Sequence, residues 1–432
     1  MFPQTERRVT GTRLSAPYDP GVFRRIIDAL FPVGRFSISE RKVVFIMWAV
    51  GIGQGYAQSN LSATIPFTRA ALSLTEAEMS LILAVTRLAG FGALAFAVWG
   101  DRRGRKVPLI AAFMLLMVAD FATGLSTSAT LFTILQSLVR IAGTALGTLA
   151  VVLIAEEVRP QTRAFAISLY GAGGSFGAGL GLLVLPLADR SEGWRLVFTL
   201  SALGLVIVPF LFRSLHESPI FEIVEEPAKH PLIRLLRSPF ARVFWLSAIA
   251  VLLASAFSAV GLAFSTERLV DDLGYTTTAA VVISLVGGTL GGIGFFIGGR
   301  LADVVGRRIT TVLSLVLVLI GGITLYYVEY LPLIVLAIVA STFGSFAFVP
   351  ASASHRAELF PTEFRTSGGT AGAYLAMVGS AVGLGIGALT IDGIGLSATV
   401  LLLGLGVIAA IVLTLMLPET MGQELDHVEA DR

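Results

Sequence analysis

The sequence predicts an all-α membrane protein whose twelve transmembrane helices form two pseudo-symmetric six-helix bundles. Three observations lead to this prediction: long apolar runs, an uneven distribution of basic residues between the loops, and an internal repeat. Hydrophobic residues make up 55% of the 432-residue chain and charged residues only 14%, whereas a soluble globular domain has about 25% charged residues. The composition therefore excludes an ordinary soluble protein.

Apolar runs of the length needed to cross a membrane recur along the whole chain. A helix needs about 20 apolar residues to cross about 30 Å of hydrocarbon. The runs are 43–66, 79–98, 107–126, 131–155, 164–187, 196–212, 243–265, 278–299, 309–328, 331–354, 366–389 and 396–417. A transmembrane β-barrel would show short alternating segments instead, so we expect every run to be a helix.

The basic residues predict the orientation of these helices. Of the 31 Lys and Arg residues, 25 fall on the side that holds both termini, four on the other side and two inside the runs. Basic loops stay on the cytoplasmic side of a membrane. We therefore expect a multi-pass protein of the inner (cell) membrane with both termini in the cytoplasm. The N-terminus shows no early apolar stretch with a cleavage site, so we expect no cleaved signal peptide.

Residues 1–42 precede the first run and form a cytoplasmic N-terminal segment. Within it, the stretch GVFRRIIDALFPVGRF (21–36) places apolar side chains on one helical face and charged ones elsewhere. This pattern indicates an amphipathic helix lying on the membrane surface. A mobile basic tail is the alternative.

The second half of the sequence repeats the first. AVWGDRRGRK (97–106) is matched by GRLADVVGRR (299–308), and EVRPQTR (157–163) by ELFPTEFR (358–365). Asp101 and Asp303 are 202 residues apart, as are Arg163 and Arg365. The repeat predicts an N-terminal bundle at 43–212, a cytoplasmic linker at 213–242, a C-terminal bundle at 243–417 and a cytoplasmic tail at 418–432.

Small residues recur every fourth position in one run of each half. They are Gly173, Gly177 and Gly181 in the first half, and Gly379, Gly383 and Gly387 in the second. Such rows allow helix backbones to approach closely in lipid. We expect each row to be a helix-packing face.

The paired loop motifs, together with GWRLVF (193–198), HESPIFE (216–222) and PETMGQEL (418–425), resemble the major facilitator superfamily. The resemblance covers about residues 43–425, and the last two segments are similar to sugar porters and metabolite/proton symporters. It implies the major facilitator fold, alternating access, and charge clusters that hold an inner gate shut. The residues it assigns to those clusters are Asp101, Arg105, Asp303, Arg307, Glu157, Arg163, Glu358 and Arg365. The alternative is that the basic residues only set topology.

Three ionisable side chains lie inside the runs: Arg87, Asp120 and Arg140. A charge at the bilayer centre costs at least about 2.5–3.5 kcal/mol, so each requires a function or a partner. One arginine can pair with Asp120, which leaves one positive charge for an anionic group of a substrate. Asp120 is also the candidate for proton coupling. The alternative is that all three are scaffold residues.

The first run is the most polar, and it carries Gln54, Tyr56, Gln58 and Asn60. Polar groups are costly against hydrocarbon, so we expect them to line a wet cavity. Hydrogen bonding between helices is the alternative. In the second half, Ser345 lies beside phenylalanines in the run 331–354 and is our candidate for the facing wall.

These features predict a secondary active transporter that takes up a small organic anion or metabolite together with protons. The alternatives are a sugar porter, a multidrug/proton efflux antiporter, and a membrane sensor that binds solute without flux. The chain has no Cys and four His residues without ligand spacing, so we expect no metal site. It has no phosphate-binding loop or nucleophile elbow, so we expect no cofactor and no enzyme activity. The expected partners are the substrate, protons and the lipid bilayer, without nucleic acid, and we expect a monomer.

Overall fold

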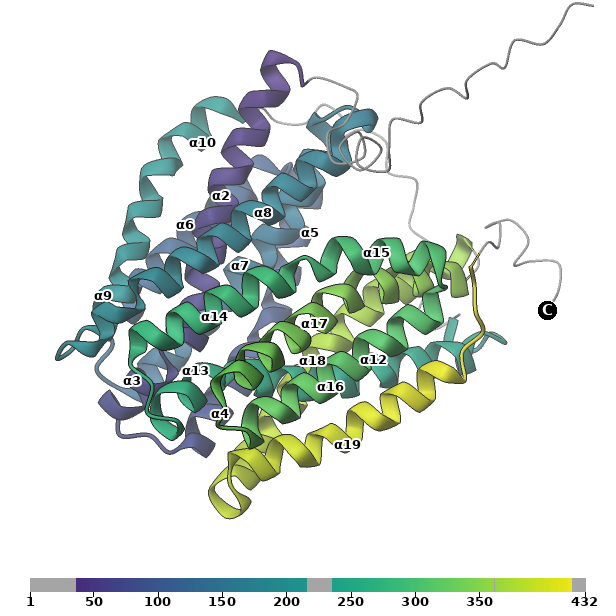
Figure 1. Ribbon diagram of the computed structural model, residues 1–432. Helices are drawn as coiled ribbons and strands as arrows, with labels where there is room; N and C mark the ends of the chain where they lie inside the picture. The colour runs from purple at the N-terminus through teal and green to yellow at the C-terminus, as the bar shows by residue number, and fades with distance from the viewer. Residues whose placement is uncertain (1–35, 216–234, 361, 422–432) are drawn as a thin grey trace, which may run out of the picture.

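The computed structural model describes residues 36–215, 235–360 and 362–421, and over these residues it is built of helices without strands (Figure 1). The amphipathic helix expected at 21–36 falls almost entirely outside the described residues. Most of the linker at 213–242 falls outside them as well. The all-α prediction is confirmed.

The helices form two halves of similar construction. The first half holds α2 (Ile38–Ala63), α3 (Ile65–Ala71), α4 (Glu76–Ala89), η1 (Gly90–Gly92), α5 (Ala93–Arg103), α6 (Lys106–Thr123), α7 (Ala129–Glu157), α8 (Pro160–Val184), η2 (Leu185–Asp189), α9 (Trp194–Thr199), η3 (Leu200–Ile207) and α10 (Val208–Ser214). The second holds α12 (Ala241–Ala263), α13 (Ser265–Glu267), η5 (Arg268–Asp272), α14 (Thr277–Gly292), α15 (Gly294–Val304), α16 (Arg307–Tyr327), α17 (Leu331–Leu359), α18 (Thr362–Ile394) and α19 (Leu396–Leu415).

Eleven segments of the described chain are long and apolar enough to cross a membrane, and they follow the predicted runs from the second to the twelfth. The first run corresponds to α2, whose 26 residues span about 39 Å at about 1.5 Å per residue. α2 is therefore long enough to cross a membrane. Its polar residues lower its mean hydropathy, so it is not among the eleven segments.

A glycine lies in the turn between equivalent helices of the two halves, α5–α6 in the first and α15–α16 in the second. Gly104 follows α5 with φ of +91°, and Gly306 precedes α16 with φ of +119°. Positive φ strains residues that carry a Cβ, so the sharp turns of the two repeated loops depend on glycine. The spacing of 202 residues seen in the sequence is thus a spacing between equivalent turns.

The glycine rows are helix-packing faces, as predicted. The row on α8 packs against α2. In the row on α18, Gly379 and Gly383 pack against α12, whereas Gly387 faces Ser80 on α4 of the other half. A Cβ at Gly177 would lie 1.9 Å from the carbonyl oxygen of Ile52, and one at Gly383 would lie 2.1 Å from that of Ala256. Because neither distance leaves room for a methyl group, these helix pairs require glycine to reach their observed separation.

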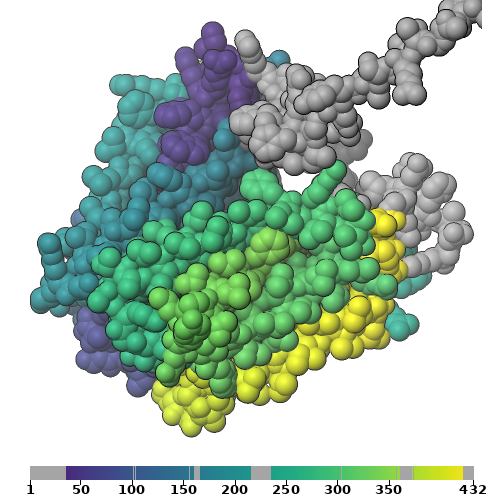
Figure 2. Space-filling model, in the orientation of Figure 1, coloured from purple at the N-terminus to yellow at the C-terminus, as the bar shows by residue number. Residues whose placement is uncertain are grey.

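The halves meet at one end of the molecule and part at the other. In Figure 1, α3 and α13 lie together at the lower left, whereas the start of α2 and the end of α15 are far apart. We call the end that holds the start of α2 and the α15–α16 turn the arginine-loop end, and the end that holds α3 and α13 the opposite end. Figure 2 shows the first half, in teal, touching α14 of the second half, in green.

An apolar cluster joins the halves toward the opposite end. It contains Ile65 and Phe198 of the first half together with Phe264 and Leu384 of the second, and all four are fully buried. Burial of about 25 cal/mol per Å² of apolar surface favours this closure where water has access.

We predict that Gly383→Ala destabilises the protein by about 1–3 kcal/mol, because its methyl group would overlap the α12 backbone. Gly385→Ala is the matched control on the same helix, since a Cβ there would meet nothing within 4 Å. Thermal unfolding of the purified protein in detergent measures both. Equal melting temperatures for the two variants would show that the close approach is not needed.

Candidate functional site

Two arginines occupy the middle of adjacent spans in the first half. Arg87 is the twelfth residue of the span Glu76–Gly100, and Arg140 is the twelfth of the span Ala129–Ile154. The two guanidinium groups lie close enough to repel each other. Both side chains are half-buried. No described carboxylate forms an ion pair with either of them, so this part of the protein carries unbalanced positive charge.

Two amide side chains of α2 form hydrogen bonds to α7, one of them to Arg140. The Gln58 Oε1 atom accepts a hydrogen bond from Arg140 Nη1 at 3.4 Å, and Gln54 Nε2 donates to the carbonyl oxygen of Gly143 at 2.7 Å. The Tyr170 hydroxyl of α8 donates to Gln54 Oε1. A Cβ at Gly143 would lie 2.1 Å from Gln58 Nε2, so this glycine makes room for the amide. Sequence reasoning found Gln54 and Gln58 but missed Tyr170.

The second half approaches the arginines through α18. A Cβ at Gly90 would lie 2.7 Å from Met377 Sδ and 3.5 Å from Arg140 Cγ. One residue further, the rings of Phe91 and Tyr374 stack with centroids 5.4 Å apart and planes at 10°. Arg140 therefore lies beside the contact between the two halves, where a bound solute can touch both.

Asp120 does not pair with an arginine, contrary to our expectation. Its Oδ2 atom accepts from Asn60 Nδ2 at 2.8 Å and its Oδ1 atom from Gln136 Nε2 at 3.4 Å. Asp120 and Asn60 are completely buried inside the first half. Tyr56 belongs to this interior as well, because its hydroxyl donates to the carbonyl oxygen of Val197 at 2.5 Å. Neighbouring amides satisfy Asp120 without a buried countercharge, and no described hydrogen bond joins Tyr56 or Asn60 to the arginines.

Ser345 is half-buried on α17. Its hydroxyl donates to the carbonyl oxygen of Ser341 at 2.8 Å, one turn earlier in the same helix. The described contacts do not bring Ser345 together with the arginines.

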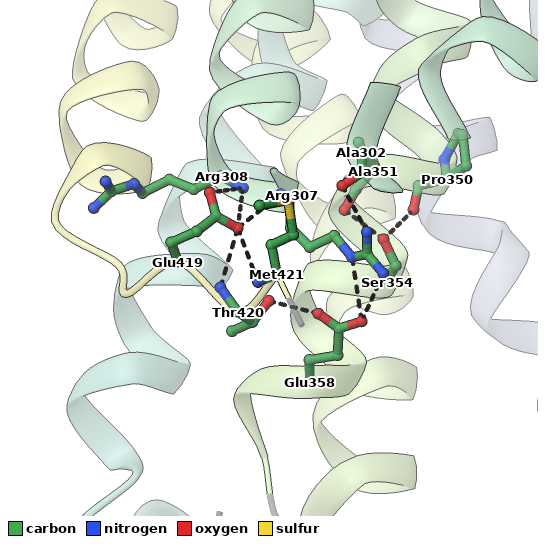
Figure 3. Close-up of polar contacts among 10 residues, drawn as sticks. All are labelled: Ala302, Arg307, Arg308, Pro350, Ala351, Ser354, Glu358, Glu419, Thr420 and Met421. Carbon is green, nitrogen blue, oxygen red and sulfur yellow. Dashed lines mark hydrogen bonds and ion pairs between the residues drawn. The ribbon is translucent and has the colours of Figure 1, made fainter. Parts of the chain in front are cut away.

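A network of polar contacts joins the helix ends of the second half at the arginine-loop end (Figure 3). Arg307 Nη2 lies 3.1 Å from Glu358 Oε1, and the Thr420 hydroxyl donates to Glu358 Oε2 at 2.6 Å. Glu419 accepts from the backbone N–H of Arg307 at 2.7 Å and from that of Arg308 at 3.1 Å. Burial alone would raise the pKa of Glu419, but its backbone hydrogen bonds outweigh that effect and hold the pKa below its usual value.

The equivalent pair in the first half involves a residue that our sequence analysis did not assign. Arg105 pairs with Glu156, with Nε 3.2 Å from Oε1. The place of Glu157 in the cluster stays a prediction. Glu156 and Glu358 are 202 residues apart, so Glu156 is the true repeat partner and the proline of the motif is shifted by one position. The side chains of Asp101, Arg163, Asp303 and Arg365 lie outside the described part of the structure.

Glu40 forms a second ion pair of the first half, which the sequence did not predict. It is 4% exposed and belongs to a capping box with Ser37 at the start of α2. Arg159 reaches it through Nε at 2.8 Å and Nη2 at 2.9 Å. These bonds lower the pKa of Glu40 to about 2. Every described ion pair at the arginine-loop end therefore joins residues of the same half.

The model of the Major Facilitator Superfamily matches residues 47–368 and 291–430, which is most of the chain. The chain belongs to the major facilitator superfamily. It is a multi-pass membrane transporter with the fold expected from its sequence.

Individual members of the superfamily are similar to this chain. An inner membrane metabolite transport protein of Escherichia coli, YhjE, is 31% identical over 64% of this chain and 69% of its own length. A hexuronate transporter of Bacillus subtilis is 25% identical over 63% of this chain and 67% of its length. The crystal structure of a D-xylose–proton symporter superposes with a TM-score of 0.71 at 17% identity, covering 89% of this chain and 99% of that one.

We predict that Glu40→Gln lowers stability at pH 7 by about 1 kcal/mol, because the partly exposed Arg159 loses its carboxylate. The pKa of Glu40 is lowered in the folded state, so its contribution is present above a pH of about 4.5 and disappears as the pH falls toward 2. Thermal melts from pH 7 to pH 3 measure this.

Glu78→Gln provides the control, because Glu78 closes the same type of capping box with Thr75 and pairs with no arginine among the described residues. A Glu40→Gln melting curve that lies parallel to that of the parent down to pH 3 would contradict the assignment.

Proposed function

We propose that this protein carries a small organic anion across the membrane and that Arg140, assisted by Arg87, binds its carboxylate. The observation that supports the proposal is the pair of adjacent mid-membrane arginines without a described acidic partner. The amides of Gln54 and Gln58 are placed to contact the polar remainder of the solute.

The energy of the arginine pair favours an anion over a neutral solute. Each arginine costs about 2.5–3.5 kcal/mol or more at the centre of a membrane, and two adjacent positive charges add repulsion. Hydrogen bonding to Gln58 does not neutralise this charge. A carboxylate can accept two parallel N–H bonds from a guanidinium group, so a bound anion relieves both the burial cost and the repulsion.

The named relatives support the same substrate class. One of them transports hexuronate, a sugar carboxylate, and another is a metabolite transport protein. A site with guanidinium groups beside amides suits a solute that carries a carboxylate together with hydroxyl groups.

We further propose that the halves rock about this site. At the opposite end, described contacts such as those of Arg69 with Asp271 and of Ser80 with Leu384 cross between the halves, whereas the described ion pairs at the arginine-loop end stay within one half. With the basic loops and both termini on the cytoplasmic side of the inner membrane, this arrangement is an inward-facing state. Closure at the arginine-loop end with opening at the opposite end would complete the cycle.

Uptake against a gradient needs an energy source, and we propose protons. Asp120 is a fully buried carboxylate, and Asn60 joins it to the same helix that carries Gln54 and Gln58.

We predict that Arg140→Gln strongly impairs uptake of glucuronate into proteoliposomes. One guanidinium contact to a carboxylate contributes about 1.5–3 kcal/mol, so affinity should fall by at least about tenfold. Uptake of radiolabelled glucuronate by the parent and by the variant measures this loss. Arg190→Gln is the control, because Arg190 is an exposed residue at the opposite end.

Unchanged glucuronate affinity in Arg140→Gln would remove this residue from the site. Glucose uptake that is as fast as glucuronate uptake would favour a sugar porter instead.

We predict that Asp120→Asn still transports solute down its gradient but no longer accumulates it against a gradient when an inward proton gradient is imposed, because asparagine cannot bind and release a proton. Solute accumulation with and without an inwardly directed proton gradient measures the loss. If proton-driven accumulation persists in this variant, Asp120 is not the coupling group.

A further inference from the structure

An arginine at the opposite end ties the two halves together. Arg69 on α3 reaches Glu267 on α13, with Nε 2.5 Å from Oε1, and Asp271 on η5, with Nη2 2.9 Å from Oδ2. Arg69 and Asp271 are 202 residues apart, which is the offset of the internal repeat. Equivalent positions of the two halves therefore pair directly with each other, as expected for residues beside the pseudo-two-fold axis.

We call the contact of Arg69 with Glu267 and Asp271 the seam. Glu267 is its buried acidic residue. Its side chain is 1% exposed, whereas that of Asp271 is 37% exposed. Neither carboxylate oxygen of Glu267 accepts a hydrogen bond of good geometry from the described residues. Its stabilisation as an anion thus depends on Arg69, which it shares with Asp271.

More carboxylates than cations face Glu267 and its surroundings. The charged groups around the seam are Arg69 on α3, Glu76 on α4, Arg268, Asp271 and Asp272 on η5, and Asp392 on α18, with the neutral Tyr326 on α16. If all are ionised, five carboxylates including Glu267 meet two arginines. Arg268 is itself engaged by Asp272 at 3.4 Å.

Water reaches part of this cluster. A cleft of about 660 Å³ opens at the opposite end and is lined by Arg69, Glu76, Asp272 and Asp392, among others. Protons from the adjacent solution can therefore reach the seam even while the halves are in contact.

We propose that closure of the opposite end is coupled to proton uptake, and that Glu267 is the group that takes up the proton. When the halves separate, each carboxylate is hydrated on its own and holds its charge. When they close, the carboxylates come together around too few cations and Glu267 loses its water. Closed protein then binds more protons than open protein, so acid shifts the equilibrium toward closure.

This inference rests on the proposed transport by rocking halves, and it supplies the step at which an external proton would act. A proton arriving at the opposite end permits closure there, which opens the arginine-loop end toward the cytoplasm. The coupling acts on the conformational change rather than on the substrate, so it does not require the substrate to be an anion.

The absence of native cysteine allows a direct test. Spin labels at Thr127→Cys and Glu329→Cys occupy exposed, repeat-equivalent loops of the two halves at the opposite end, 202 residues apart. Double electron–electron resonance on the substrate-free full chain in lipid nanodiscs then reports the closed and open populations. We expect the ratio of closed to open protein to be about tenfold higher at pH 5 than at pH 8.

Glu267→Gln should remain predominantly closed at both pH values, because its neutral amide needs no proton to close. Glu76→Gln, which removes a different seam carboxylate, should raise the closed fraction at pH 8. Glu192→Gln is the control, since Glu192 is an exposed carboxylate that pairs with Arg195 inside the first half. A pH-independent distance in the parent, or full pH dependence in Glu267→Gln, would overturn the inference. Failure of glucuronate uptake would leave these distances unaffected and would count against the substrate proposal alone.

Discussion

Uncompensated positive charge in a low-dielectric interior is the constraint on which the rest of this structure depends. Arg87 and Arg140 stand in the middle of adjacent spans, and the carboxylate closest to them in depth, Asp120, is engaged by amides instead. A membrane protein tolerates such charge where water, backbone or a ligand satisfies it. The Gln58 amide gives Arg140 a polar contact, and Met377 of α18 borders it at the junction of the two halves.

Close helix packing makes this arrangement rigid enough to be useful. The glycine faces of α8 and α18 place the α2 and α12 backbones against them without intervening side chains. Each half can then move as a body while its internal amide and ion-pair contacts persist. Contacts that cross between halves, such as those of Arg69, are the ones that must break when the molecule changes state.

Most of the architecture can be predicted from the sequence, because the patterns that indicate it lie within short stretches of the chain. Span lengths follow from hydropathy, the glycine rows from spacing, and Arg140 is conspicuous as a charge within an apolar run. The partners of the charged residues were less predictable, since they depend on helices distant in sequence. Asp120 could have accepted an arginine, but the fold presents Asn60 and Gln136 to it. Glu156 was overlooked because the proline of its motif is displaced by one residue.

Residues at the seam were the hardest to foresee. Glu267 follows an apolar run and looks like an ordinary solvent-exposed loop residue until α3 covers it. Tyr170 likewise gains its polar partner from another helix, because its hydroxyl reaches Gln54 across the α2–α8 contact. Such pairs exist only after two halves or two helices have come together, so neither spacing nor composition encodes them.

Thermal stabilisation of the purified protein by glucuronate, compared with glucose at equal concentration, tests the central claim most directly. The two sugars differ mainly in the carboxylate, so any difference in stabilisation reports its interaction with the arginines. We expect glucuronate to raise the melting temperature in proportion to its occupancy and glucose to leave it unchanged. Equal stabilisation by both sugars, or by glucose alone, would contradict an anion site at Arg87 and Arg140.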